Sequence, residues 1–447
     1  MTKDDISYLF LALLHILLGV VIYLFPALSK LYTAVILAGG LLFVVIRQNR
    51  NHEVLLVCAY IVGSEAFLRM TGGNPIYEFS KYAIIIFMLV GMYYQGFSSR
   101  AVPYWIFLLL LVPGLVLATQ TFHLERSMRK IISFNISGEL ALGIAALYCY
   151  SRQISFKRLN TLLLWMVLPI VSMVIYLILY TPNVREVITS TNSNFETSAG
   201  YGPNQVATIL GLGMFIMFSR ILFTTKANIV LLVNLALGLI ITYRGLVTFS
   251  RGGMITGFAM LVVLFVFTYI RASGTGKTKL NYIFIPLVVA LIGIWSYSSL
   301  QTGGLIEKRY SNEDALGREK KDQFTGREFI ATTEIEYFLQ NPIFGVGVAQ
   351  GAEIRKEQTG ELIVSHNEIT RMMAEHGMLG IIALLILLIT PLALYLENKG
   401  HLYLVAFIVF WLLTINHTAI RMAAPAFVYA LSLLKVVPNE ENIVHRK

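Results

Sequence analysis

A chain of 447 residues that is 56% hydrophobic and only 13% charged is too apolar for an ordinary soluble protein, since soluble domains carry about 25% charged residues. Its formal charge of +10 does not require a nucleic-acid partner, because lysine and arginine accumulate in the cytoplasmic loops of membrane proteins. The two cysteines, Cys58 and Cys149, lie in apolar stretches, which indicates buried thiols and not a disulfide or a metal site.

Apolar runs long enough to cross a hydrocarbon layer of about 30 Å recur along the whole chain. The first, from Ile6 to Phe25, is followed at once by another and lacks a small-residue cleavage site, so we interpret it as a helix and not a removed signal peptide. About fourteen candidate spans are found, or twelve if the shortest do not cross: 6–25, 31–46, 54–68, 79–95, 102–118, 134–150, 160–180, 205–223, 228–249, 253–271, 281–299, 378–396, 402–416 and 419–436. The sequence therefore predicts an all-α, polytopic membrane protein with about 12–14 transmembrane helices.

The distribution of basic residues between the loops predicts the orientation. One set of alternate loops and the C-terminal tail contain Arg47, Arg50, Arg100, Arg152, Lys157, Arg158, Arg220, Lys226, Arg271, Lys277, Lys279, Lys399, Lys435, Arg446 and Lys447. The opposite short loops are poorer in lysine and arginine, which places both termini in the cytoplasm. The expected organisation is membrane helices over 1–299, a large external loop over 300–377, membrane helices over 378–437 and a cytoplasmic tail over 438–447.

Three polar segments are expected on the outer side. Thr119–Ser133 is short and could lie along the membrane interface, and Thr181–Asn204 is rich in Ser, Thr and Asn. The third is the large loop, whose helix-like periodicity favours an ordered, partly helical cap, and long loops are more often functional or disordered than idle.

Arg251 stands in "TFSRGGMITG" (Thr248–Gly257), where two apolar spans meet on the outer side. A cation near hydrocarbon costs roughly 2.5–3.5 kcal/mol on insertion scales, so an idle arginine is not expected, although one that snorkels to the lipid headgroups remains an alternative. Gly252 and Gly253 would let the backbone approach a bulky anion and open a helix whose N–H groups face outward. A guanidinium beside such a helix start suits a phosphate or diphosphate.

His366, in "VSHNEI" beside Asn367, precedes the point where the loop re-enters the membrane. A lone histidine is more often structural, but an imidazole at the only large polar surface can accept a proton from a hydroxyl near neutral pH. His376 is a weaker rival. The two histidines lack metal-site spacing and no HExxH motif or cysteine cluster exists, so no metal is expected, although the loop carboxylates leave a divalent cation open.

Other polar residues carry less weight. Arg327, in "FTGREF", precedes a helical pattern and taken alone resembles a surface arginine. Polar residues in or near membrane spans tend to face the bundle interior and to pair, which we expect of Glu65, Arg69, Asn135 and Glu139. The same expectation applies with less force to His417 and Arg421.

The order of several motifs resembles the bacterial O-antigen ligase and O-antigen polymerase family. The motifs are "SRGG" (Ser250–Gly253), "GRE" (Gly326–Glu328), "NPIFGVG" (Asn341–Gly347) and "SHNEITRMMAEHGMLGIIALL" (Ser365–Leu385). They cover roughly Gly245 to Leu388, and "YGPNQVATILGLG" (Tyr201–Gly213) is similar to a preceding helix start of the family, less specifically. Each motif is short, and the resemblance depends on their order and spacing.

The resemblance implies glycosyl transfer at the periplasmic face of the bacterial inner membrane. The donor would be a glycan on undecaprenyl diphosphate, and the acceptor a lipid A-core sugar or another glycan. Arg251 and Arg327 would hold the diphosphate and His366 would deprotonate the acceptor hydroxyl. The family also suggests a metal-independent, inverting reaction without cofactor, on a fold akin to C-type glycosyltransferases. Supporting positions would be Ser250, Gly252, Asn367, Asn204, Arg244 and His376.

Four functions remain open at this point. A ligase is favoured because one external loop dominates, whereas a polymerase of this family tends to have two substantial loops. A protein O-oligosaccharyltransferase would use the same chemistry on Ser or Thr. A polysaccharide flippase or transporter is less favoured, because transporters place polar groups at the midplane between related halves, and here they gather at one face.

Overall fold

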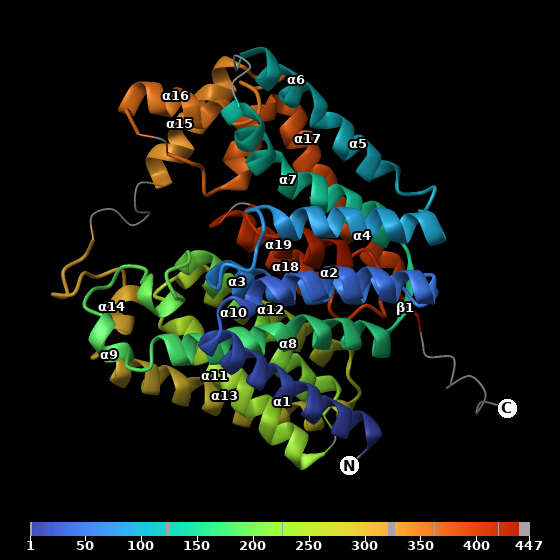
Figure 1. Cartoon of the computed structure of the whole chain (residues 1–447), viewed down its shortest axis with the longest axis vertical. Helices are drawn as coiled ribbons and strands as arrows, with labels where there is room; N and C mark the ends of the chain where they lie inside the picture. Colours follow the sequence, from blue (N-terminus) through green and yellow to red (C-terminus); the bar gives the residue numbers. More distant parts are fainter. Residues whose placement is uncertain are drawn as a thin grey trace. The chain divides into compact units, whose positions relative to one another are not determined.

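The computed structural model describes residues 2–121, 126–225, 227–320, 327–361, 363–418 and 420–437. Almost all of its regular structure is helical (Figure 1), which confirms the predicted all-α, polytopic class. The strands of the described chain are β1 (Gln153–Ser155) and β2 (Lys435–Val437), which pair with each other.

Ten helical segments in the described part of the chain are long and apolar enough to cross a membrane. They belong to α1 (Lys3–Leu24), α2 (Leu28–Arg47), the consecutive α5 (Val102–Leu110) and α6 (Val112–Thr121), α7 (Arg126–Cys149), α8 (Phe156–Tyr180), α10 (Pro203–Phe223), α11 (Asn228–Leu246), α12 (Arg251–Arg271), α13 (Gly274–Gln301) and α17 (Glu368–Glu397). The remaining predicted spans overlap α3 (Glu53–Met70), α4 (Phe79–Gln95), α18 (Leu404–Ile415) and α19 (Ala423–Leu431).

The chain divides into two compact units. Unit 1 contains Met1–Tyr77 and Ser155–Lys321, and unit 2 contains Glu78–Ile154 and Asp322–Pro438. The large loop predicted over 300–377 is therefore shared. Its first part, with α14 (Leu305–Tyr310), belongs to unit 1, and its α15 (Arg327–Gln340) and α16 (Gln350–Thr359) belong to unit 2.

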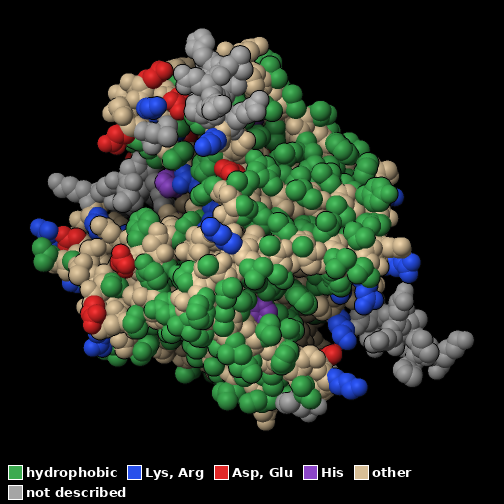
Figure 2. All heavy atoms as spheres, viewed as in Figure 1, with side chains coloured by type: hydrophobic (Ala, Val, Ile, Leu, Met, Phe, Trp, Pro, Cys, Tyr) green, Lys and Arg blue, Asp and Glu red, His purple; other side chains and the backbone are tan. Residues whose placement is uncertain are grey.

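Unit 1 is built around α10, which packs against α12, α11, α3 and α8. Glycines permit the closest of these contacts, because a Cβ atom on Gly211 would lie 2.1 Å from the carbonyl oxygen of Gly253, and one on Gly257 would lie 2.3 Å from that of Gly211. Small residues are the usual means of close helix packing in membranes. Exposed apolar side chains cover α1 and α2 (Figure 2), including Leu13, Leu17, Leu31 and Val35, as expected for surfaces that face lipid.

Unit 2 contains a break in its longest helix. Gly377 has φ +61° and ψ −140°, a conformation that strongly favours glycine. The turn Asn341–Gly347 occupies this break, since Val346 N–H donates to the Ala374 carbonyl (2.8 Å) and Met378 N–H donates to the Pro342 carbonyl (2.8 Å). The "NPIFGVG" motif therefore has a structural role, which is to satisfy backbone groups that the interrupted helix leaves open.

Candidate active site

Arg251 is the first residue of α12 and follows a tight turn from α11. Phe249 in this turn is buried and has φ +56°, an unusual conformation for an aromatic residue. Ser250 donates a hydrogen bond from its hydroxyl to Asn204 Oδ1 at the start of α10 (2.7 Å). The predicted helix start at Arg251 is confirmed, and Ser250 and Asn204 together fix it against α10.

Gly253 serves packing rather than the approach of an anion. A Cβ atom at Gly253 would lie 2.3 Å from the backbone of Ala207 and Thr208 in α10. Gly252 is half-buried, and its carbonyl accepts a hydrogen bond from Thr256 (2.8 Å). Of these two glycines, Gly253 therefore has a clear packing role.

Two further cations lie beside Arg251. Arg251 Nη1 donates to the carbonyl of Arg309 in α14 (3.2 Å), and Arg309 Nε donates to the carbonyl of Phe249 (2.9 Å). Partial burial lowers the pKa of Lys320, and the charges of Arg309 and Arg251 lower it further, against a smaller opposing effect of Asp314. We call Arg251, Arg309 and Lys320 the basic cluster.

The electrostatics of the basic cluster suit an anion with more than one charge. Among the residues that the structure describes, no acidic side chain forms a salt bridge with Arg251 or Lys320. Like charges held this close repel each other, and an added anion relieves that repulsion. Burial raises the pKa of neighbouring Tyr310 to about 12, so its hydroxyl stays protonated and can donate a hydrogen bond at neutral pH.

An apolar cavity of about 440 Å³ adjoins this cluster. Helices α10 to α13 form most of its wall, and Tyr310 lines it too. Representative lining residues are Met214, Leu246, Met254, Phe258, Trp295 and Tyr310. Its volume falls within the range of ligand sites, about 300–1,000 Å³. An elongated apolar group attached to an anion would fit this pairing of cavity and cations.

Hydrogen bonds from Arg244 hold the loop 181–202 in place. This buried arginine donates to the carbonyls of Thr181 (3.2 Å) and Thr197 (3.1 Å). The same loop meets the basic cluster, since Asn192 Oδ1 accepts from Lys320 Nζ (3.1 Å) and Ser193 Oγ accepts from Arg309 Nη2 (3.4 Å). Arg244 therefore supports a loop that contacts the cluster, and its Nη1 and Nη2 both donate to backbone carbonyls of that loop.

His366 lies in unit 2, in a short irregular segment before α17. Asn367 is the N-cap of that helix, and its Oδ1 accepts a hydrogen bond from Ile369 N–H (2.9 Å). Arg421 donates to the carbonyl of Ser365. The imidazole is half-buried, so it is held between fixed neighbours and keeps contact with the surface.

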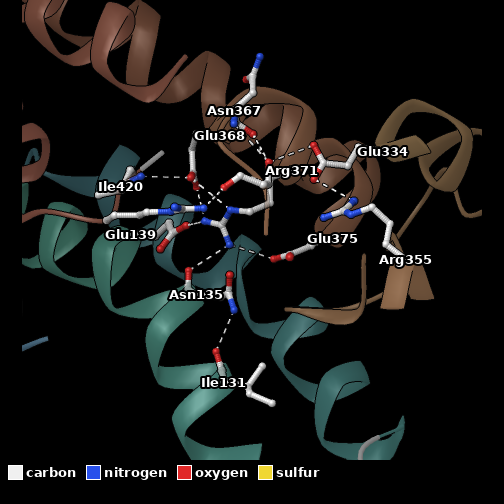
Figure 3. Close-up of polar contacts among 12 residues, drawn as sticks. Ile131, Asn135, Glu139, Glu334, Arg355, Asn367, Glu368, Arg371, Glu375 and Ile420 are labelled. Atoms are coloured by element: carbon white, nitrogen blue, oxygen red, sulfur yellow. Dashed lines mark hydrogen bonds and ion pairs between the residues drawn. The ribbon is translucent and has the colours of Figure 1, made fainter. Parts of the chain in front are cut away.

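A buried charge network lies below this segment (Figure 3). Arg371 binds three carboxylates, those of Glu139, Glu368 and Glu375, and also donates to the Asn135 carbonyl (3.1 Å). The expected pairing of Glu139 is therefore confirmed. In unit 1, the expected pairing of Glu65 with Arg69 is confirmed by a contact of 2.7 Å.

Two other predicted residues are placed differently from His366. His376 is 1% exposed and its ring packs where any side chain on Gly114 would lie, so it packs in the interior of unit 2. Arg327 begins α15, and its side chain lies outside the described residues. The predicted site residues are thus divided, with Arg251, Ser250, Gly252, Asn204 and Arg244 in unit 1 and His366, Asn367, Arg327 and His376 in unit 2.

The sequence did not indicate that Arg309 and Lys320 lie beside Arg251 in the candidate site. Both stand in a mixed-charge stretch that reads as a solvated loop surface, and no local motif separates them from Arg318 or Lys321. It also missed Glu334 and Arg355, which form a buried pair (3.3 Å) next to the His366 segment.

Comparison with known families agrees with the motifs. Residues 235–385, about a third of the chain, match the family model described as O-antigen ligase. The matched part runs from α11 into α17 and includes both Arg251 and His366. The predicted resemblance is thereby confirmed over this part of the chain. No curated protein matches the chain.

Proposed function

We propose, from its similarity to O-antigen ligases over residues 235–385, that this membrane protein transfers a glycan from undecaprenyl diphosphate to an acceptor hydroxyl. The family match supports glycan transfer of the ligase or polymerase type.

The observation that carries the proposal is the basic cluster next to the apolar cavity. Arg251, Arg309 and Lys320 would bind the diphosphate, and the cavity behind Tyr310 would hold the part of the prenyl chain nearest to it. The remainder of the chain would lie in the bilayer. A lipid diphosphate is a good leaving group, so the catalytic task is to stabilise charge on the departing oxygens, which preorganised cations do effectively in a partly desolvated site.

His366 is proposed as the general base. Its imidazole would take the proton of the acceptor hydroxyl as that oxygen attacks the anomeric carbon and the bond to the diphosphate breaks. Arg327 keeps its proposed role as a second diphosphate ligand. We further propose an inverting reaction without metal, a periplasmic large loop and a location in the bacterial inner membrane, and the resemblance supports each of these.

A ligase acting on a lipid A-core sugar remains the preferred form. One observation favours a polymerase as the second candidate. The 181–202 loop is ordered by Arg244, and its Asn192 and Ser193 accept hydrogen bonds from Lys320 and Arg309 of the basic cluster. This supports counting it as a second substantial external element of the kind that polymerases of this family tend to have.

The test is a transfer assay with purified protein in detergent, a glycan on undecaprenyl diphosphate, and separate lipid A-core, glycan and peptide acceptors. Wild type should glycosylate one acceptor class. His366→Ala should lose about 10²–10⁴-fold in rate, the usual contribution of positioned proton transfer, and retain donor binding.

His52→Asn is the control, since His52 is similarly half-buried and lies in a predicted cytoplasmic turn where its φ of +59° suits asparagine. Full activity of His366→Ala would remove the histidine from the mechanism. Loss of donor binding in that variant would instead move His366 to the diphosphate side. Absence of transfer to all three acceptors by wild type would refute the proposed function.

A further inference from the structure

The segment that presents His366 is anchored by two buried charged residues from other helices. Residues 363–367 have no regular secondary structure. Arg355 of α16 donates from Nε to the Ile363 carbonyl (3.1 Å) and from Nη1 to Glu334 Oε1 of α15 (3.3 Å). Ser365 donates from its hydroxyl to Glu334 Oε2 (3.2 Å). The pair therefore contacts the segment at two positions just before the histidine.

The anchoring continues on both sides of His366. Glu334 Oε2 also accepts from the hydroxyl of Thr370 in the first turn of α17 (2.6 Å). Asn367 N–H donates to Ser365 Oγ (3.2 Å), which closes a small turn around the histidine. The carboxylate of Glu334, which Figure 3 shows beside Arg355, therefore binds residues that precede and follow His366.

The burial of this pair needs a reason beyond stability. The Arg355 and Glu334 side chains are 1% and 2% exposed. A buried ion pair loses much of its attraction to desolvation, and a hydrophobic replacement is often at least as stable. Its use here is geometric. Arg355 Nε and Glu334 Oε2 bind residues on either side of His366, and Arg355 Nη1 and Glu334 Oε1 bind each other and so fix the two side chains.

We propose that Glu334 and Arg355 are positioning residues that hold the His366 imidazole in the orientation needed to accept a proton from the acceptor hydroxyl. This inference rests on the proposed role of His366 as the base. The pair touches no substrate itself. It acts by holding the Ile363 carbonyl and the Ser365 hydroxyl, and displacements of about 1 Å in an active site can cost about 10²-fold in rate.

The test uses Glu334→Gln, which keeps the size of the side chain but replaces one acceptor oxygen by an NH₂ group that faces donors. Glu336→Gln is the matched control, since it makes the same change two residues away on the exposed face of α15. Glu334→Gln should lower kcat about 10- to 100-fold and leave the KM for the donor unchanged, and Glu336→Gln should change neither. If Glu334→Gln does not fold, Ser365→Ala removes one bond of the same set.

Two readouts separate positioning from general damage. In a His366→Ala background, Glu334→Gln should cause no further loss, because the base that it positions is gone; an equal loss in both backgrounds would overturn the inference. Without substrates, modification of His366 by diethyl pyrocarbonate should be faster in Glu334→Gln than in wild type, with His52 as internal reference.

The modification experiment does not depend on transfer activity. An unchanged modification rate together with normal kcat would refute positioning. An altered rate in a protein that transfers no glycan would uphold the anchoring of His366 and refute the proposed reaction, so the two failures are distinguishable.

Discussion

One guanidinium nitrogen of Arg251 donates a hydrogen bond to the carbonyl of Arg309. The remaining N–H groups of this planar side chain can donate to an anion. A lysine at this position would keep the charge and lose the fork geometry that matches phosphate oxygens. We expect Arg251→Lys to lower transfer about 10- to 100-fold, because hydrogen bonds between charged groups contribute about 1.5–3 kcal/mol. The measurement is turnover of purified protein, with the melting temperature as a check on folding.

Arg318→Lys is the matched control for this substitution. Arg318 is 73% exposed and pairs with Asp314 on the surface, where such pairs contribute little. Near-normal turnover by Arg251→Lys would leave Arg251 as a point charge or as an arginine that snorkels to the lipid headgroups.

Lys320 gives the basic cluster a pH dependence with a definite sign. Its pKa is lowered by partial burial and by Arg309 and Arg251, and a bound diphosphate would raise it again by opposing those charges. Affinity should therefore be full below the lowered pKa and fall as pH rises through it, because the neutral amine no longer attracts the anion. Calorimetric titration with geranyl diphosphate from about pH 7 to pH 10 measures this.

The Lys320→Arg variant isolates the contribution of the lysine, because arginine stays protonated over this range. It should keep its affinity at high pH where wild type loses it. The same pH dependence in both proteins would exclude Lys320 from the anion site.

At the level of single residues, the sequence indicates candidate site residues that stand in an unusual sequence context and misses candidate site residues that do not. Arg251 was identifiable because a charged residue interrupts two apolar spans, and His366 because it stands at a loop-to-helix junction. Arg309 and Lys320 resemble their charged neighbours until folding brings α14 beside Phe249. Glu334 was not predictable for the same reason. The pattern of the helix that contains it does not indicate which of the helix's carboxylates is buried.

At the scale of the elements, α17 is a helix with a built-in interruption. The sequence indicates that "NPIFGVG" is a turn and that apolar helix follows Gly377. It does not indicate that the turn packs into the helix, with Gly347 N–H donating to the Glu375 carbonyl (3.1 Å). Such a contact joins residues about thirty positions apart, so no local pattern encodes it.

The contact between α10 and α12 makes a prediction about stability. A Cβ atom at Gly257 would lie 2.3 Å from the carbonyl oxygen of Gly211, which is backbone and cannot rotate away. Gly257→Ala should therefore separate the two helices and destabilise the protein by about 1–3 kcal/mol, the usual cost of overpacking. The melting temperature in detergent should fall.

Gly293 in α13 is the control for this effect. Among the described residues, and apart from the backbone of α13 itself, a Cβ atom there has no neighbour within 4 Å, and alanine is the better helix former by about 1 kcal/mol. Gly293→Ala should melt at or above the temperature of wild type. If Gly257→Ala and Gly293→Ala had the same melting temperature, the glycines of α10 and α12 would not set the spacing of these two helices.

At the scale of the whole molecule, composition predicts how many helices form but not how they are grouped. The apolar parts of α10 and α13 have the same mean hydropathy, yet 89% of the first and 11% of the second is buried. In a membrane, lipid tails and helix partners are about equally apolar, so hydrophobicity alone does not distinguish a central helix from a peripheral one. The division into two units, which separates Arg251 from His366, was for this reason not predictable.

The distribution of Lys and Arg between the loops predicts the orientation of the protein in the membrane. Both termini are expected in the cytoplasm and the 300–377 loop outside, where a lipid-linked glycan and its acceptor would meet. Ser311 is exposed in that loop, so Ser311→Cys should react with a membrane-impermeant maleimide in intact spheroplasts. Lys447→Cys should react only after lysis.

The wild-type protein is the background control for this labelling, because Cys58 and Cys149 are both buried and should not react. The orientation and the proposed reaction depend on each other, since the proposed lipid-linked donor would be consumed on the outer side only if the basic cluster and His366 were exposed on that side. Labelling of the tail in intact spheroplasts with a protected Ser311→Cys would therefore refute the periplasmic site as well as the topology.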